Sequence, residues 1–174
     1  MPEPPLIETP SVSTAQIVAR VSRIVGGDDF PNGERAALKR WSPGSGHTLA
    51  FHKFAARHLP VDWEWKKDEW ATIVTGVAIS HPYNQSPGAP PGKALAESGY
   101  SETRLERLLA AQGDGLLTLV LRSARFLRAK NVAFDWTGIA YLLGINGNSD
   151  QTRFRIARDY YRELQRQDGN QRKE

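Results

Sequence analysis

The stretch GKALAESGYSETRLER, residues 92–107, is predicted to contain a joint between two helices, and this joint indicates a helical fold. A short lysine-bearing helix ends at Gly99, because glycine readily adopts the left-handed conformation that ends many helices. Ser101 then begins a second helix, since its hydroxyl can accept a bond from a first-turn amide. That helix carries Arg104 and Arg107. The stretch predicts two helices at a fixed angle with cations pointing outward, as a protein that grips a phosphate backbone requires.

The helical pattern continues on both sides of this joint. Apolar residues recur at three- and four-residue spacing, and capping residues, glycine or proline delimit the segments. No segment shows the alternation of a half-buried strand, so the predicted fold class is all-α. The predicted helices cover residues 14–25, 34–41, 48–59, 68–80, 93–97, 101–112, 116–130, 135–143 and 150–167. Their expected caps include Ser101, Asp114, Asp135 and Asp150.

Two segments are not predicted to be helical. Residues 1–13 are rich in Pro, Ser and Thr and predict a disordered arm. The loop HPYNQSPGAPPG, residues 81–92, is predicted to be an interdomain linker or an exposed loop. It separates an N-terminal unit, residues 14–90, from a C-terminal unit, residues 91–174.

The basic charge of the chain lies in its second half. Residues 1–87 contain nine Lys+Arg and nine Asp+Glu, whereas residues 88–174 contain fourteen and ten. Eleven of those fourteen cations are arginine, whose planar fork suits phosphate recognition. Binding to a polyanion is one interpretation. A solvated, salt-bridged surface is the other, and charge alone does not separate them.

Two predicted helices concentrate these arginines. In residues 116–130, Arg122, Arg125 and Arg128 share one sector and no acidic residue lies within the helix, which favours an anionic partner. In residues 150–167 a second stripe is predicted, formed by Arg155, Arg158, Arg162 and Arg166, with Phe154, Ile156, Tyr160, Tyr161 and Leu164 on the opposite, inward side. Asp159 and Glu163 can pair with this second stripe.

Catalytic and metal-binding patterns are missing from the sequence. The chain has no cysteine, which excludes disulfides, thiolate zinc sites and cysteine nucleophiles. Its four histidines form no H-E-x-x-H pattern, and no phosphate-binding loop or nucleophile elbow occurs. An acidic cluster suggests a magnesium site, but a helix-entry segment explains it better: Asp62, Glu64, Asp68 and Glu69. The sequence predicts a binding protein without metal or cofactor, and no signal peptide or membrane span is seen, which predicts a cytoplasmic location.

The order of several motifs resembles CasB, the small subunit of Cascade, the type I-E CRISPR surveillance complex. The similarity includes LKRW at 38–41, AFHKFA at 50–55, GKALAESG at 92–99, SETRLERLL at 101–109, FDW at 134–136 and RIARDYY at 155–161. It extends over nearly the whole chain after residue 14.

The resemblance implies an elongated all-helical molecule of two small bundles without known catalytic activity. The implied role is to contact crRNA and the target and non-target DNA strands and to stabilise the R-loop. The implied protein partners are the large and backbone subunits and a second copy of the chain. The family's basic positions correspond to Lys39, Arg40, Lys53, Lys93, Arg104, Arg122 and Arg125, with Arg107, Arg128 and Arg155 as weaker candidates.

Two other functions are left open by the residues. A stand-alone helical regulator would read duplex DNA with the helix that begins at Ser101. A magnesium-dependent nuclease would use the acidic cluster around Asp62.

Overall fold

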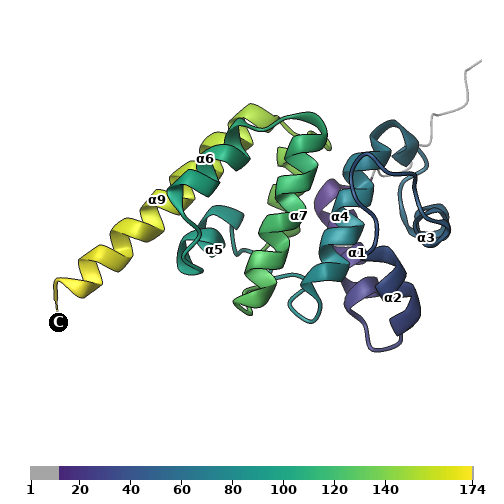
Figure 1. The fold of residues 1–174 in the computed structure, drawn as a ribbon, viewed down its shortest axis with the longest axis horizontal. Helices are drawn as coiled ribbons and strands as arrows, with labels where there is room; N and C mark the ends of the chain where they lie inside the picture. Colours follow the sequence, from purple (N-terminus) through teal and green to yellow (C-terminus); the bar gives the residue numbers. More distant parts are fainter. Residues whose placement is uncertain (1–11, 174) are drawn as a thin grey trace, which may run out of the picture.

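A computed structural model describes residues 12–173, which form nine α-helices and one 3-10 turn, with no strand among these residues (Figure 1). The all-α prediction is confirmed. The elements are α1 (Thr14–Gly26), α2 (Asn32–Leu38), α3 (Leu49–His58), η1 (Trp63–Lys66), α4 (Lys67–Ser80), α5 (Pro91–Glu97), α6 (Glu102–Ala110), α7 (Gly113–Ala129), α8 (Trp136–Leu142) and α9 (Ser149–Gln171). None of these helices combines the length and apolarity needed to cross a membrane.

The helix caps agree with the sequence at two of the four predicted positions. Ser101 accepts a hydrogen bond from the amide of Arg104, and Asp135 accepts one from the amide of Thr137. The predictions for Asp114 and Asp150 were wrong. Helices α7 and α9 begin earlier, after Gln112 and Asn148, so both carboxylates lie within the first turn and not at the cap.

Most of the predicted N-terminal arm, residues 1–11, lies outside the described residues. Its last residue belongs to the folded body. The hydroxyl of Ser13 accepts a bond from the amide of Gln16, whose side chain accepts one from the amide of Ser13. This reciprocal pair is a capping box at the start of α1.

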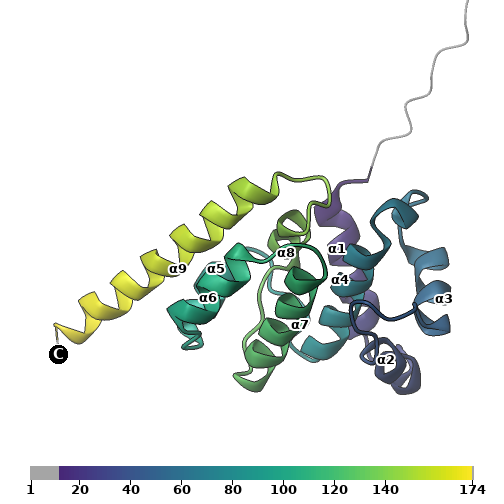
Figure 2. The same ribbon diagram turned by 45° about the horizontal axis from the view of Figure 1, so that its top comes forward.

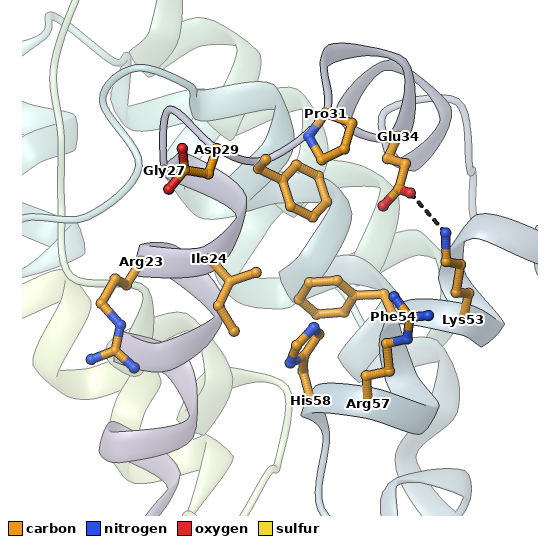
Figure 3. Close-up of a pocket in the computed structure, with 11 residues that line it drawn as sticks. Arg23, Ile24, Gly27, Asp29, Pro31, Glu34, Lys53, Phe54, Arg57 and His58 are labelled. Atoms are coloured by element: carbon orange, nitrogen blue, oxygen red, sulfur yellow. Dashed lines mark hydrogen bonds and ion pairs between the residues drawn. The ribbon is translucent and has the colours of Figure 1, made fainter.

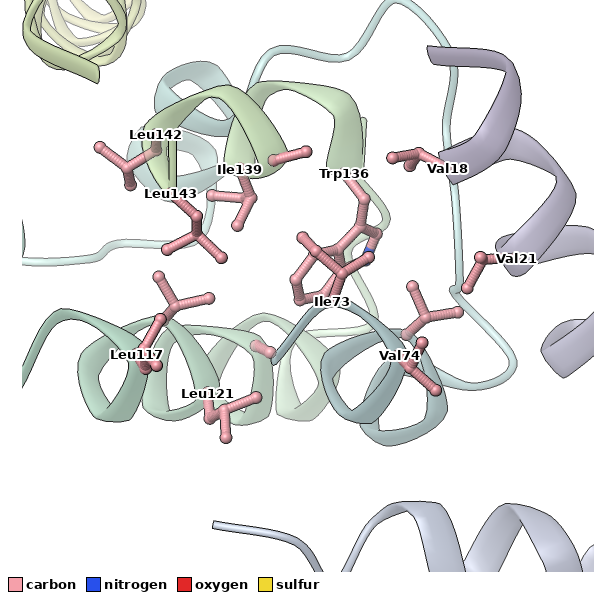
Figure 4. Close-up of a cluster of buried hydrophobic side chains, with 14 of the residues drawn as sticks. Val18, Val21, Ile73, Val74, Leu117, Leu121, Trp136, Ile139, Leu142 and Leu143 are labelled. Carbon is pink, nitrogen blue, oxygen red and sulfur yellow. The ribbon is translucent and has the colours of Figure 1, made fainter. Parts of the chain in front are cut away.

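Helix α4 forms the centre of the core. Ten of its fourteen residues are buried, and α1, α7 and α8 pack around it. Trp136 of α8 is fully buried against α4 at Gly76, where an added Cβ would lie 2.2 Å from the indole ring. Only glycine leaves room for this ring, which packs with Ile73 and Val74 between α1 and α7 (Figure 4). Trp136, the largest buried side chain in the second half of the chain, therefore packs directly against α4, the central helix of the first half.

The two-bundle arrangement is not confirmed by the structure. Buried side chains from Ile17 to Tyr160 belong to one hydrophobic cluster that includes both halves of the chain. The proline-rich loop between the halves is also bound to the body. The amide of Asp135 donates to the carbonyl of Ala89, and Gln85 bonds through its side chain to Asp135 and to the amide of Trp136.

Helix α9 packs along α5 and extends beyond the rest of the molecule at its C-terminal end (Figure 2). The contact is so close that an added Cβ at Gly92 would lie 2.2 Å from the carbonyl oxygen of Ile156. The hydroxyl of Tyr160 donates to the carbonyl of Tyr100 at 2.5 Å. These contacts fix which face of α9 is buried.

Candidate nucleic-acid interface

A groove of about 340 Å³ lies between α6 and α7, next to the joint that the sequence predicted. Its lining consists of Tyr100, Arg104, Arg107, Leu119, Arg122 and Phe126. Three of the predicted site residues therefore lie in one place. No carboxylate is among these lining residues, and within residues 12–173 none of the three arginines has an ion-pair partner within 4.0 Å. We call this surface the arginine groove.

Aromatic packing positions Arg104 in the arginine groove. Its guanidinium lies 5.5 Å from the ring centroid of Phe126, within the range of a cation–π interaction. Tyr100 packs edge-on against the same ring at 5.2 Å, and its hydroxyl is 3.0 Å from the hydroxyl of Ser123. Lys130 approaches the Phe126 ring as well, at 5.8 Å. The cationic groups of Arg104 and Lys130 thus both lie against the Phe126 ring, next to the arginine groove.

The remaining basic residues of α7 differ in their surroundings. Arg125, one turn from Arg122, is exposed. Arg128 is half-buried: its Nε donates to the carbonyl of His81 at 2.7 Å, and its guanidinium lies over the ring of Tyr83. A further bond joins it to Asn131 at 3.1 Å. Arg128 therefore holds the loop after α4 in place, and these bonds weigh against its predicted contact with nucleic acid.

The candidates in the first half lie outside the arginine groove. Lys39 and Arg40 are exposed directly after α2. Lys53 of α3 donates to Glu34 at 2.8 Å, and this hydrogen bond lowers the pKa of the Glu34 carboxyl below its usual 4.5. The charge of Lys53 is thus partly neutralised within the protein.

Lys53 also borders a second pocket, of about 420 Å³, between α1, α2 and α3 (Figure 3). Phe30 and Phe54 meet edge to face in this pocket at 6.3 Å. Arg23 and Arg57 lie on its rim, together with Asp29 and Glu34. Burial lowers the pKa of His58, and the charges of Arg20 and Arg57 lower it further. Acidic and basic groups are mixed here, in contrast to the arginine groove.

The predicted arginine stripe of α9 is partly neutralised. Arg158 pairs with Asp159 at 3.1 Å, and Arg166 forms a forked bond to Glu163, with contacts of 2.6 to 3.1 Å. Arg155 is exposed. In α5, Lys93 lies 3.7 Å from Glu97. Asp159 and Glu163, the acidic residues beside the stripe, therefore both form ion pairs with its arginines.

The inward face predicted for α9 was partly wrong. Ile156 and Tyr160 are buried as expected, but Phe154 is 78% exposed and Tyr161 is 44% exposed. The close contact between Gly92 and Ile156 sets the rotation of α9, which turns Phe154 toward solvent. This rotation depends on a contact between residues 64 positions apart, so helical periodicity does not reveal it.

Two further side chains were not predicted to have long-range roles. Arg153 donates to the carbonyls of Leu109 and Ala111 and so joins α9 to the end of α6. Nε2 of His47 lies 2.8 Å from a carboxylate oxygen of Asp68, a member of the acidic cluster. Among residues 12–173 no group of three acidic, histidine or cysteine side chains is placed to hold a metal ion.

The family comparison agrees with the resemblance that the motif order indicated. The sequence model for "CRISPR-associated protein Cse2" matches residues 34–161, about three quarters of the chain. The chain belongs to the Cse2 family. Cse2 is the same family as CasB, so the resemblance is confirmed and the chain is assigned to the subunits of the CRISPR Cascade complex. Among curated proteins and among solved structures, no match to the chain is found.

Cse2 proteins are structural subunits and in general not catalytic. The matched region includes the arginine groove, both predicted candidates after α2, and the part of α9 that ends at Tyr161. Membership favours a role in an assembly over a stand-alone regulator or a nuclease.

Proposed function

We propose that this Cse2-family chain is a non-catalytic subunit of type I-E Cascade that contacts the backbones of crRNA and target DNA and stabilises the R-loop during antiviral defence. The observation that carries the proposal is the arginine groove, in which Arg104, Arg107 and Arg122 line one surface without a carboxylate. Like charges so placed repel one another, and a phosphate group relieves this repulsion. Arginine also binds phosphate through two parallel hydrogen bonds.

The groove fits recognition of backbone better than recognition of base edges. In RNA-guided complexes the guide reads the sequence by base pairing, and the protein recognises the geometry and backbone of the hybrid. Contacts to phosphate fix position without sequence preference. A subunit with this role needs cations on an exposed surface, and all three guanidinium-bearing residues are exposed.

Modest binding energy is sufficient for this role. The RNA–DNA hybrid is about as stable as the DNA duplex that it replaces, so opening of the target is nearly balanced. Hydrogen bonds to charged groups contribute about 1.5 to 3 kcal/mol each. Two or three contacts of this size shift the balance toward the open state.

The predicted site residues rank differently once their surroundings are considered. Arg104, Arg107, Arg122 and the neighbouring Arg125 are the first candidates. Lys39, Arg40, Lys93 and Arg155 come second, because they are exposed but lie outside the groove. Lys53 and Arg128 come last, because their cationic groups are bonded within the protein. The same proposal includes contacts to the displaced strand, to a second copy of the chain and to the large and backbone subunits. It also includes a cytoplasmic location.

The test is R-loop formation by assembled Cascade that contains the double variant Arg107→Glu/Arg122→Glu. The matched control is Arg172→Glu/Lys173→Glu, which reverses two exposed charges at the end of α9. We expect the groove variant to weaken target binding by about 30-fold or more, equally for all targets, and the control to bind like the wild type. Unchanged R-loop formation by a folded, incorporated groove variant would reject the proposal. Preference of the isolated chain for one duplex sequence would favour the regulator instead.

A further inference from the structure

Two aromatic side chains lie on the outer face of α9, and one of them, Tyr161, packs edge-on against the ring of Tyr160 at 5.3 Å. Phe154 is 78% exposed, and Tyr161, seven residues later, is 44% exposed. Seven residues correspond to two helical turns, about 10.5 Å along the axis, so both rings lie on one face. A single exposed apolar side chain is common on protein surfaces, so the inference depends on the groups that surround these two rings.

The fold holds these rings outward. Rotation of α9 to bury Phe154 would separate Gly92 from the backbone of Ile156 and would break the bond from Tyr160 to Tyr100. The hydroxyl of Tyr161 is 3.3 Å from Glu102 of α6, which orients its ring from the side. The exposure of both rings is therefore a fixed property of the packing between α9 and its neighbours.

An arginine follows each aromatic residue directly in the sequence. The pairs are Phe154-Arg155 and Tyr161-Arg162, and Arg158 lies between them. At 3.6 residues per turn the five side chains fall within about 120° of the helix circumference. Among residues 12–173, Arg155 and Arg162 have no ion-pair partner within 4.0 Å, whereas Arg158 shares its charge with Asp159. The face thus carries two pairs of an aromatic ring and a guanidinium, and the pairs lie two helical turns apart.

We propose that this face of α9 binds single-stranded nucleic acid, with unpaired bases stacked on Phe154 and Tyr161 and phosphates beside Arg155 and Arg162. Proteins that bind single strands combine stacked aromatic side chains with a basic track, because every base offers a flat face. Duplex bases are already stacked on each other and leave no face for Phe154. The inference rests on the proposed function, since an opened target duplex supplies an unpaired strand.

The site is distinct in chemistry from the arginine groove. In the groove, Arg104 and Lys130 already lie against the ring of Phe126. On α9, by contrast, the Phe154 ring is open to solvent. The groove suits phosphates alone, whereas the α9 face suits bases together with phosphates.

The experiment measures binding of the full chain to fluorescent oligothymidine of about 12 nucleotides, a length within the range of single-strand sites. The variants are Phe154→Leu, which keeps an apolar side chain without a flat ring, and Phe154→Trp, which keeps the ring. We expect Phe154→Leu to weaken binding by about 5- to 150-fold, corresponding to one lost stacked base, and Phe154→Trp to bind at least as well as the wild type. Because Phe154 is exposed, both variants should melt like the wild type.

A strand of the same length without bases provides the second measurement. It should bind the wild type more weakly than oligothymidine binds Phe154→Leu, because the stacking on Tyr161 is lost as well, and Phe154→Leu should make no further difference on it. The salt dependence should be the same for wild type and Phe154→Leu, because no charge is removed. Equal binding of oligothymidine by wild type and Phe154→Leu, or no binding by the wild type, would overturn the inference. If Phe154→Leu instead reduces only incorporation into Cascade, the face docks a protein and the inference is wrong.

The inference about the α9 face and the proposed function of the arginine groove can fail independently of each other. Charge reversal at Arg107 and Arg122 tests the groove in assembled Cascade, whereas Phe154→Leu leaves the groove intact and is tested on a free single strand. Loss of one effect with retention of the other identifies which claim fails.

Discussion

The guanidinium of Arg104 lies 5.5 Å from the ring centroid of Phe126, at the edge of the arginine groove. Arg104 comes from the helix joint and Phe126 from the basic helix α7, so this contact joins the two sequence features that first suggested phosphate binding. Exposed cation–π contacts contribute about 0.5 to 1 kcal/mol. We infer that the ring reduces the freedom of Arg104 before any anion binds.

Replacement of Phe126 should therefore reduce target binding without removing a charge. We expect Phe126→Leu to lower the affinity of Cascade for target DNA by about two- to fivefold, the size of one cation–π contact. Phe126→Tyr keeps the ring and should bind like the wild type. Equal affinities of the leucine and wild-type proteins would show that the ring does not position Arg104.

Gly76 should not tolerate a side chain. An added Cβ would lie 2.2 Å from the ring of Trp136, which is fully buried, so Gly76→Ala forces the core apart. We expect a loss of about 1 to 3 kcal/mol in the free energy of unfolding, measured by urea denaturation. Gly33 in α2 has no atom within 4 Å of its added Cβ, and Gly33→Ala should be neutral or slightly stabilising. Similar stabilities of the two variants would contradict the packing described for the core.

Arg35 in α2 is predicted to be structural, although the candidate site residues Lys39 and Arg40 directly follow this helix. It is buried, and it donates to the carbonyls of Val25 and Gly27 at 2.9 Å and to Asn32 at 2.7 Å. Arg35→Met leaves the carbonyl of Val25 without its donor, whereas the carbonyl of Gly27 still accepts from the amide of Phe30, and the substitution should cost about 1 to 3 kcal/mol of stability. The exposed Arg40 provides the control, since Arg40→Met should melt like the wild type. A thermally unchanged Arg35→Met protein would contradict this assignment.

The sequence was sufficient to predict the helices, because capping residues and apolar periodicity are local signals. Ser101 and Asp135 cap the helices that they were expected to cap, and the apolar residues of α4 are buried as their pattern indicates. Arg104, Arg107 and Arg122 were each predicted as candidates, but that these three line one groove follows from how α6 meets α7.

Long-range packing explains what the sequence did not show. The exposure of Phe154 follows from the contact between Gly92 and Ile156, and the neutralisation of Lys53 follows from the approach of α3 to Glu34. Arg128 was expected to face a ligand, but its partner His81 lies 47 residues away. Such pairings depend on how helices meet, and a single sequence contains no direct signal for them.

Acid should remove the stabilisation that Glu163 provides. The hydrogen bond from Arg166 lowers the pKa of the buried Glu163 carboxyl below its usual 4.5, despite the opposing effect of burial. A lowered pKa in the folded state means that the carboxylate contributes fully above about 4.5, and that the contribution is lost as pH falls through the lowered pKa. Urea unfolding of wild type and Glu163→Gln should therefore differ at neutral pH and converge in acid. A difference independent of pH would contradict the ionic contact with Arg166.

The salt dependence of target binding by assembled Cascade tests the central claim most directly. Each phosphate contact made by an arginine changes the slope of log affinity against log salt by about 0.7 to 0.9. Arg122→Met should lower the magnitude of this slope by that amount for every target sequence, and the exposed control Arg172→Met should leave it unchanged. An Arg122→Met complex that contains the variant subunit and has the wild-type slope would show that the arginine groove does not contact the nucleic-acid backbone.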